Sequence, residues 1–466
     1  MLFNSLTFVV FLVVVYGVWR LLPGGRSRNV WLLLGSYVFY GAWDWRFLGL
    51  LLLSTVIDYT AGRTMAGAGP VRRRAALLVS LCMNLGLLGV FKYLDFGIES
   101  MVALLRWLGM NPHWETVGLI LPVGISFYTF QTISYTVDVY RGVTEPERNF
   151  LDFALYVAFF PQLVAGPIEQ STNLLPQLKR PHPVTREDIR IALHWILLGY
   201  FKKVVMADTL APMIDSIFSA PQSFSFLPLL AGGVGFGFQV YGDFCGYTLI
   251  ARGVALLFGI RLVVNFRRPF LAVSPRDFWR RWHLSLSTWL RDYLFIPLGG
   301  SRGGRLMTAR NLMILMVLGG LWHGASWTFV LWGAYHGVVL VLCQLLVPRG
   351  AEETWKGGKR VAAILVTYTL TLAGLILFRI RSLADLGAYA RGLTVFGPIG
   401  PAMEYLLPVL AFGTLLMVYH EWAERKNDDL VLLHAPAWLR WSVNMFMLLA
   451  LALSDSQQTP FVYFQF

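Results

Sequence analysis

The sequence contains few charged residues and few cysteines, and each shortage excludes a class of protein. Only 14% of its 466 residues are charged, against about 25% in an ordinary soluble globular protein. The three cysteines, Cys82, Cys245 and Cys343, lie far apart and form neither a CxxC pair nor a zinc-ligand spacing. Because they lie in apolar stretches, we expect small buried residues, with no disulfide framework and no metal site.

Apolar residues are abundant instead. Hydrophobic residues make up 56% of the chain, and its mean hydropathy is +0.58. We therefore predict an all-α polytopic integral membrane protein with about 10–13 membrane segments, some of them re-entrant, since the longest apolar runs count as two segments each. Runs near the spanning length of about 20 residues lie at 2–22, 30–53, 75–94, 117–139, 150–165, 191–211, 226–260, 311–347, 361–380, 403–420 and 438–453.

Positive charge is placed in short loops between the apolar runs. The net charge of +13 could suggest a nucleic-acid partner, but loop lysines and arginines set membrane topology, so we expect no nucleic-acid binding. The first positive charges, Arg20, Arg26 and Arg28, lie at the end of the first apolar run and after it, which argues against a cleaved signal peptide and places the N-terminus outside. The run at 30–53 has basic residues on both flanks. Either one loop departs from the positive-inside rule, or this run folds back near residues 41–46.

An ionisable residue lies inside a long apolar stretch that begins after Arg310. If the chain climbs as a helix from there, His323 lies about 20 Å along the axis, past the midplane of a bilayer core roughly 30 Å thick. An ionisable group at that depth indicates a functional site, although a histidine can also be a neutral group hydrogen-bonded between packed helices. Gly319, Gly320 and Gly324 weaken the helix and permit close backbone approach, which favours a segment that lines a cavity.

Two segments in the first half of the chain are unusual for membrane helices. Pro161, Gly166 and Pro167 interrupt a short apolar run and predict a re-entrant or broken helix. The segment at 121–142 carries a polar stripe. Polar side chains in a membrane helix face other protein or a water-filled cavity, so the stripe either lines a cavity or joins helices. Its members recur at three- or four-residue spacing and are Phe127, Gln131, Ser134, Asp138 and Arg141.

The largest cluster of positive charge lies at 261–310, with ten arginines, no lysine and two acids. Ser274 predicts a helix N-cap, because proline follows at the first helical position and an acid stands in the first turn. We expect this helix to run on to Tyr293 at the level of the lipid headgroups, with tryptophans on one face and His283 beside that face. The glycine-rich loop at 296–304 is cationic and suits either a phosphorylated donor or anionic lipid.

Two blocks of the sequence closely resemble the membrane-bound O-acyltransferases. They are RRWHLSLSTWLRDYLFIPLGGSRG at 280–303 and LWHGASWTFVLWGAYHG at 321–337. Similarity extends to 122–142, to FPQLVAGP at 160–167 and to PFVYFQF at 460–466, and so covers nearly the whole chain. Within the family, the chain is similar to the bacterial branch of alginate and cellulose O-acetylation proteins. It is more distantly similar to the D-alanyl transfer protein of teichoic acids.

The resemblance implies a fold: a ring of tilted helices around a thin membrane region, with a funnel or tunnel that reaches a central histidine. We interpret the chain as one such domain, with N-terminal spans (1–120), a catalytic core (121–347) and C-terminal spans (348–466).

The resemblance also implies site residues. The family's invariant catalytic histidine falls on His323, and its second signature histidine falls on His283. Acyl transfer needs a base that accepts a hydroxyl proton near pH 7, and a buried neutral imidazole can do so. His283 would orient the donor, stabilise the oxyanion or fix the tunnel wall. His336 joins this site only if the chain breaks after His323, so we interpret it as structural. The expected substrate-binding residues are Gln131, Trp279, Arg280, Trp282, Arg291, Asp292, Arg302 and Trp322.

The family function follows as an expectation. The protein would pass an acetyl group from a cytoplasmic thioester, acetyl-CoA, through the bacterial inner membrane to an exported polysaccharide such as alginate or cellulose. No cofactor would be bound permanently. The implied partners are a periplasmic or membrane-tethered acetyltransferase with a Ser-His-Asp site, the polysaccharide synthesis and export complex, and membrane lipid.

Two other functions fit part of the sequence. D-Alanyl transfer from an acyl-carrier protein to teichoic acid would use the same histidines, but the extra C-terminal spans favour polysaccharide acetylation. A transporter or flippase would also have broken helices and polar residues at the membrane midplane. The two halves of this chain, however, show no matching pair of broken apolar segments, and the unusual residues gather in one histidine region.

Overall fold

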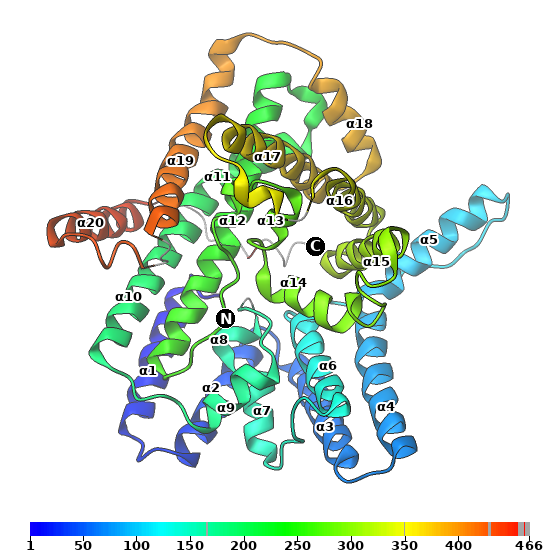
Figure 1. Ribbon diagram of the computed structural model, residues 1–466, viewed down its shortest axis with the longest axis vertical. Helices are drawn as coiled ribbons and strands as arrows, with labels where there is room; N and C mark the ends of the chain where they lie inside the picture. The colour runs from blue at the N-terminus through cyan, green and yellow to red at the C-terminus, as the bar shows by residue number, and fades with distance from the viewer. Residues whose placement is uncertain (165, 349, 427–429, 455–460, 462–466) are drawn as a thin grey trace. The chain divides into compact units, whose positions relative to one another are not determined.

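The computed structural model describes residues 1–164, 166–348, 350–426, 430–454 and 461, and within these residues every regular element is a helix (Figure 1). Two shorter apolar helices are Leu6–Leu21 and Ala437–Leu453. The prediction of an all-α polytopic membrane protein is confirmed. Five of the described helices are long and apolar enough to cross a membrane, namely Pro70–Trp107, Gly304–His323, Trp327–Leu346, Gly357–Arg379 and Ile399–Ala423.

The chain divides into two compact units. The first comprises residues 1–189, 254–263 and 324–326. The second comprises residues 190–253, 264–323 and 327–466. His283 and His323 therefore both belong to the second unit.

A buried carboxylate joins three helices of the first unit. Asp58 on α3 accepts hydrogen bonds from Ser80 (2.5 Å) and Asn84 (2.9 Å) on α4, and Ser80 also donates to Thr136 on α6 (3.1 Å). Because a buried charge is costly unless it is hydrogen-bonded, this cluster specifies how α3, α4 and α6 pack. The unit contains α1 (Leu6–Leu21), α2 (Arg26–Gly41), α3 (Leu48–Met65), α4 (Pro70–Leu88), α5 (Leu94–Trp107), α6 (Ile125–Arg141), α7 (Phe150–Ala158), α8 (Phe160–Leu163) and α9 (Ser171–Lys179).

The structure decides two points left open for this unit. The apolar run at 30–53 breaks after Gly41, and a 3₁₀ turn at Trp45–Phe47 leads into α3, so the run forms two helices. The expected broken helix is also present, because α7 ends at Ala158 and only the four-residue α8 follows. Residue 165 lies outside the described part of the chain.

The second unit contains most of α10, most of α12 and the helices that are not in the first unit. Its elements are α10 (Arg186–Tyr200), the π-helix η3 (Phe201–Asp208), α11 (Thr209–Ser219), α12 (Phe226–Leu257), α13 (Pro275–Trp279), α14 (Leu284–Leu290), the π-helix η6 (Arg291–Phe295), α15 (Gly304–His323), α16 (Trp327–Leu346), α17 (Gly357–Arg379), α18 (Leu383–Gly392), α19 (Ile399–Lys426) and α20 (Ala437–Leu453).

Helices α15 and α16 pack closely through two glycines. A Cβ atom on Gly320 would overlap the backbone carbonyl of Phe329, and one on Gly333 would overlap that of Met316. Such backbone obstacles cannot move aside as a side chain can, so only glycine fits at either position. The expected close backbone approach is present at Gly320, and α15 continues through Gly319 and Gly320 to end at His323, directly before Gly324. Close packing against α16 provides the stability that glycine lacks.

The predicted helix from Pro275 to Tyr293 is interrupted. It begins as expected, since the Ser274 hydroxyl accepts a hydrogen bond from the Asp277 N–H (3.0 Å), but α13 ends at Trp279 and α14 starts only at Leu284. The segment that follows α12 supplies the reason. The backbone carbonyl of Asn265 accepts a hydrogen bond from the Leu284 N–H (3.0 Å), and its side-chain oxygen accepts one from the Ser285 N–H (3.1 Å). These partners replace the helical ones and allow the break.

The three cysteines are free thiols. Cys245 and Cys343 are buried as expected, but Cys82 is exposed. It lies on α4, in one of the candidate membrane spans. Burial was the wrong expectation there, because a spanning helix turns part of its apolar surface away from the protein.

Candidate active site

His323 occupies the last position of α15, where the helix ends before α16. Its side chain is buried and its ring lies among aromatic rings. The centroid distances are 5.0 Å to Trp322, 5.1 Å to Trp332 and 5.2 Å to Phe378. Trp332 belongs to α16 and Phe378 to α17. Three helices therefore hold this imidazole in place.

His283 lies in the break between α13 and α14 and is almost fully buried, with 1% of its surface exposed. Its backbone is left-handed (φ 45°), a conformation that a non-glycine residue adopts only at some energetic cost. The backbone N–H groups of the next two residues, Leu284 and Ser285, donate hydrogen bonds to Asn265 and hold His283 there. The Phe244 ring packs edge-on against the His283 imidazole at 4.6 Å. Burial lowers the pKa of His283 to about 3, so this imidazole is neutral near pH 7.

The two histidines that the sequence singled out are neighbours in the structure. The centroids of the His283 and His323 rings are 6.4 Å apart, and Trp322 lies beside both, 5.9 Å from His283. At this ring separation one hydroxyl oxygen can hydrogen-bond to both imidazoles, because each bond spans about 2.8 Å. A continuous helix through 275–293 would have directed His283 differently. The helix break is thus part of the site.

A small cavity adjoins His323 on the side of α16 and α17. Its volume is about 20 Å³, enough for one or two water molecules. The predicted residues Trp279 and Trp282 line it, as does His336. The remaining lining residues are Val240, Phe278, Trp332, Thr371, Leu375 and Phe378.

The structure places the predicted charged residues elsewhere. Arg280, Arg291 and Arg302 are exposed, and Arg291 forms a salt bridge with its neighbour Asp292 (2.7 Å). None of these four is among the residues that line the cavity beside His323.

Gln131 lies on α6 in the first unit, in the polar stripe that the sequence indicated. Its side-chain amide donates to the Tyr156 carbonyl (2.7 Å) and accepts from Gln162 (2.6 Å). Both partners lie on neighbouring helices of that unit. At this position the stripe joins helices, which was one of its two interpretations.

Sequence reasoning missed Trp332 and Phe378 and interpreted His336 as structural. The condition set for His336 is met, because α15 ends at His323 and α16 begins only at Trp327. The His336 ring lies 4.7 Å from Trp332 and 5.2 Å from Trp279. The signal for this return was present in the sequence, since Gly324 directly follows His323. No pattern near Phe378 marked it as a neighbour.

Comparison with known proteins shows the family of this chain. The profile of the membrane-bound O-acyltransferase family matches residues 147–372. A probable alginate O-acetylase, AlgI of Azotobacter vinelandii, is 41% identical over 426 residues, which cover 90% of this chain and 83% of that protein. This chain belongs to the membrane-bound O-acyltransferase family. It is accordingly an O-acyltransferase and a multi-pass membrane protein.

Two further relatives act on other polymers, to judge by their names. The peptidoglycan O-acetyltransferase of Helicobacter pylori is 36% identical over 392 residues, covering 78% of this chain and 73% of the relative. The teichoic acid D-alanyltransferase of Bacillus subtilis is 25% identical over 282 residues, which cover 58% of this chain and 71% of the relative. The family motif at the C-terminus, PFVYFQF, lies outside the described residues except for Phe461, whose ring packs 5.4 Å from Phe244.

Proposed function

We propose that this protein transfers an acetyl group from a cytoplasmic acyl thioester, acetyl-CoA, across the bacterial inner membrane for O-acetylation of an exported polysaccharide. The observation that carries the proposal is the buried pair of imidazoles, His323 at the end of α15 and His283 in the break between α13 and α14, with ring centroids 6.4 Å apart. The names of the relatives support the reaction class, since alginate and peptidoglycan O-acetylation both join acetate to a sugar hydroxyl.

The pair suits a general-base mechanism. His323 accepts the proton of the attacking hydroxyl while the hydroxyl oxygen bonds to the thioester carbonyl carbon. The C–S bond then breaks, and the proton passes from His323 to the departing thiolate. The neutral His283 has one N–H, which can donate to the carbonyl oxygen as negative charge develops there. The hydroxyl belongs either to the polymer or to a carrier residue of a partner.

The small cavity favours a short acyl group. At about 20 Å³ it holds only one or two water-sized groups, so a long acyl chain could enter only if the tryptophans moved. The exposed Arg280, Arg291 and Arg302 would attract the phosphates of the thioester donor through their positive charge. Partners that fit this scheme are a periplasmic or membrane-tethered Ser-His-Asp acetyltransferase and the polysaccharide export complex.

The test is ester-linked acetate on the secreted polysaccharide of the host. We expect His323→Gln to lower acetylation at least about 100-fold, because a positioned general base contributes a factor of that size or more. His336→Gln, at the cavity wall, should lower it less. The matched control is His113→Gln, since His113 is exposed. Membrane levels of all variants are compared by immunoblot.

Normal acetylation by a stably inserted His323→Gln protein would contradict the proposed role of His323. The alternative reaction is D-alanyl transfer, favoured by the resemblance to the Bacillus relative. Purified protein distinguishes the two, because acetyl-CoA turnover requires an acetyl donor site, whereas D-alanyl transfer would require a charged carrier protein. A transporter would leave either thioester intact.

A further inference from the structure

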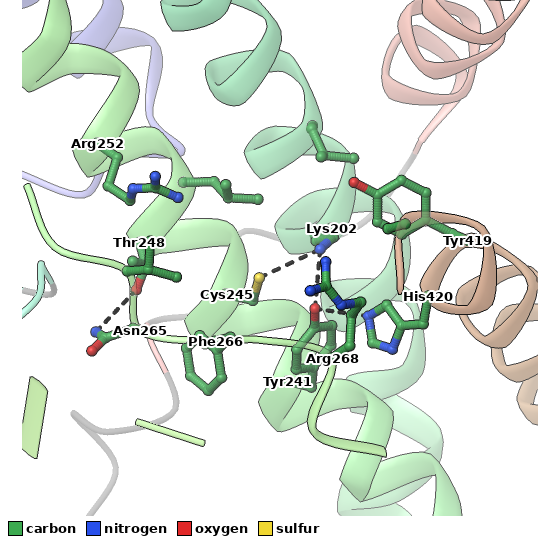
Figure 2. Close-up of a pocket in the computed structure, with 14 residues that line it drawn as sticks. Lys202, Tyr241, Cys245, Thr248, Arg252, Asn265, Phe266, Arg268, Tyr419 and His420 are labelled. Carbon is green, nitrogen blue, oxygen red and sulfur yellow. Dashed lines mark hydrogen bonds between the residues drawn. The ribbon is translucent and has the colours of Figure 1, made fainter. Parts of the chain in front are cut away.

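A second cavity in the second unit is lined by basic residues (Figure 2). Its volume is about 40 Å³. No acidic residue is among the described residues that line it. The lining residues come from α10, η3, α12, the segment after α12 and α19. The polar ones are Lys202, Tyr241, Cys245, Thr248, Arg252, Asn265, Arg268, Tyr419 and His420.

The cavity contains a buried lysine, Lys202, whose surroundings differ from those of its neighbour Lys203. Lys203 is buried and forms salt bridges with Asp208 and Asp243, both at 2.8 Å. Lys202 is also buried, with 5% of its surface exposed, but no described carboxylate lies within salt-bridge distance of it. Its amine contacts the Tyr241 hydroxyl (3.2 Å) and the Cys245 sulfur (3.4 Å). A buried cation is costly without a counter-charge. Lys203 has two carboxylates as counter-charges, and Lys202 has none among the described residues.

His420 extends this arrangement. Its Nε2 atom lies 2.9 Å from the Tyr241 hydroxyl, so amine, hydroxyl and imidazole form a chain of polar contacts along the cavity (Figure 2). The side chain is fully buried, and its Nδ1 atom has no hydrogen-bond partner among the described residues. Buried polar atoms are normally paired, which indicates a bound group or water beside this imidazole.

Arg268 reaches the same cavity from a strained backbone position. Its φ is 50°, and among the described non-glycine residues only His283 shares a positive φ. A left-handed arginine costs free energy that a glycine would avoid, and such strain persists where the position of a side chain matters. Of these two strained residues, His283 belongs to the histidine site and Arg268 lines this cavity.

We propose that this cavity binds a phosphate group. Lys202 and Arg268 supply positive charge, and His420 and Tyr241 supply hydrogen-bonding atoms. A guanidinium matches phosphate oxygens in a bidentate manner, and an ammonium adds a point charge. The volume fits a group of a few heavy atoms but not a whole nucleotide. The phosphate belongs either to a soluble molecule such as the thioester donor or to an anionic lipid.

The phosphate cavity lies one layer of aromatic rings from the histidine site. The Tyr241 ring packs 5.6 Å from Phe266, which packs 5.0 Å from Trp282. Trp282 in turn lines the cavity beside His323. A phosphate bound here would therefore anchor its carrier close to the reacting groups. Binding itself does not depend on the acyl-transfer reaction, so the test measures binding.

The experiment uses the full chain, purified in an uncharged maltoside detergent. Three probes are compared: inorganic phosphate, coenzyme A and short-chain phosphatidylglycerol. The variants are Lys202→Met and Arg268→Gly, and glycine at 268 removes the charge while relieving the backbone strain. Arg267→Gly is the matched control, because Arg267 is the adjacent exposed arginine and its loss changes the net charge equally.

We expect wild type and Arg267→Gly to bind at least one probe, and both cavity variants to bind it at least about tenfold more weakly, as expected for losing one charged contact. If the cavity variants weaken the binding of coenzyme A or inorganic phosphate, the natural ligand is a soluble molecule. If they weaken the binding of phosphatidylglycerol, it is a lipid. The proposal is overturned if wild type binds none of the probes. It is equally overturned if folded Arg268→Gly binds all of them as wild type does.

Discussion

The close packing of α15 against α16 gives a sharp prediction at two adjacent glycines. In Gly320→Ala the new methyl group would overlap the Phe329 carbonyl oxygen and lie 3.2 Å from the Gly333 Cα atom. In Gly319→Ala it would meet only the Leu290 side chain, at an ordinary 3.4 Å. Both changes raise helix propensity by the same amount, about 1 kcal/mol, so this contribution cancels when the two variants are compared.

The remaining difference is the cost of overpacking. Because backbone atoms block the Gly320 methyl group, the helices must separate by on the order of 1 Å, at a cost of about 1–3 kcal/mol. His323 lies one turn after Gly320, and its neighbour Trp332 lies on the displaced helix. A shift of about 1 Å in a catalytic group lowers the rate by roughly 100-fold. Gly320→Ala should therefore be less stable and far less active than Gly319→Ala.

The assays are thermal unfolding of the purified proteins and ester-linked acetate on the secreted polysaccharide. Gly319→Ala should unfold at or above the wild-type temperature and retain activity. Equal unfolding temperatures and equal acetylation in the two alanine variants would refute the argument that α15 and α16 meet through Gly320. A stability loss without an activity loss would show that the helix contact does not position His323.

Two further predictions concern stability. Ser274→Ala should lower the free energy of unfolding by about 1 kcal/mol, because the N-cap bond to Asp277 and the hydrogen bond to Glu352 (2.6 Å) are lost. The control is Ser301→Ala, since Ser301 is exposed. Equal unfolding temperatures of the two variants would contradict this prediction. Burial alone would raise the pKa of Asp188, but hydrogen bonds from Thr185 and the Arg261 guanidinium lower it to about 2. Since the unfolded value is about 4, the stability that this carboxylate contributes is complete above about pH 4 and is lost as the pH falls toward 2. The unfolding temperatures of wild type and Asp188→Asn should therefore differ near pH 7 and converge below pH 4, and a gap that stays constant across this range would refute it.

The sequence indicated candidate residues for the chemistry more readily than it indicated where those residues lie. His283 and His323 were recognisable because an ionisable group in an apolar setting is unusual and because the surrounding motifs resemble a family. The arginines around them were expected to bind the donor because a guanidinium suits phosphate. The structure leaves Arg280, Arg291 and Arg302 exposed and places other basic residues, Lys202 and Arg268, in a cavity. Charge shows that a residue can bind an anion, but only packing decides what surrounds it.

The sequence by itself determined the class of the protein and the start of its key helix. Apolar runs of spanning length require helices, because backbone groups in a bilayer must satisfy one another, and the Ser274 cap is a local interaction between residues three apart. Only the tertiary structure decided the break before His283, where Asn265 accepts hydrogen bonds from the backbone N–H groups of residues nineteen and twenty positions further on. It also decided the return of His336 to the His323 cavity and the phosphate cavity formed by α10, α12 and α19. These features depend on contacts between distant segments, and local patterns cannot specify them.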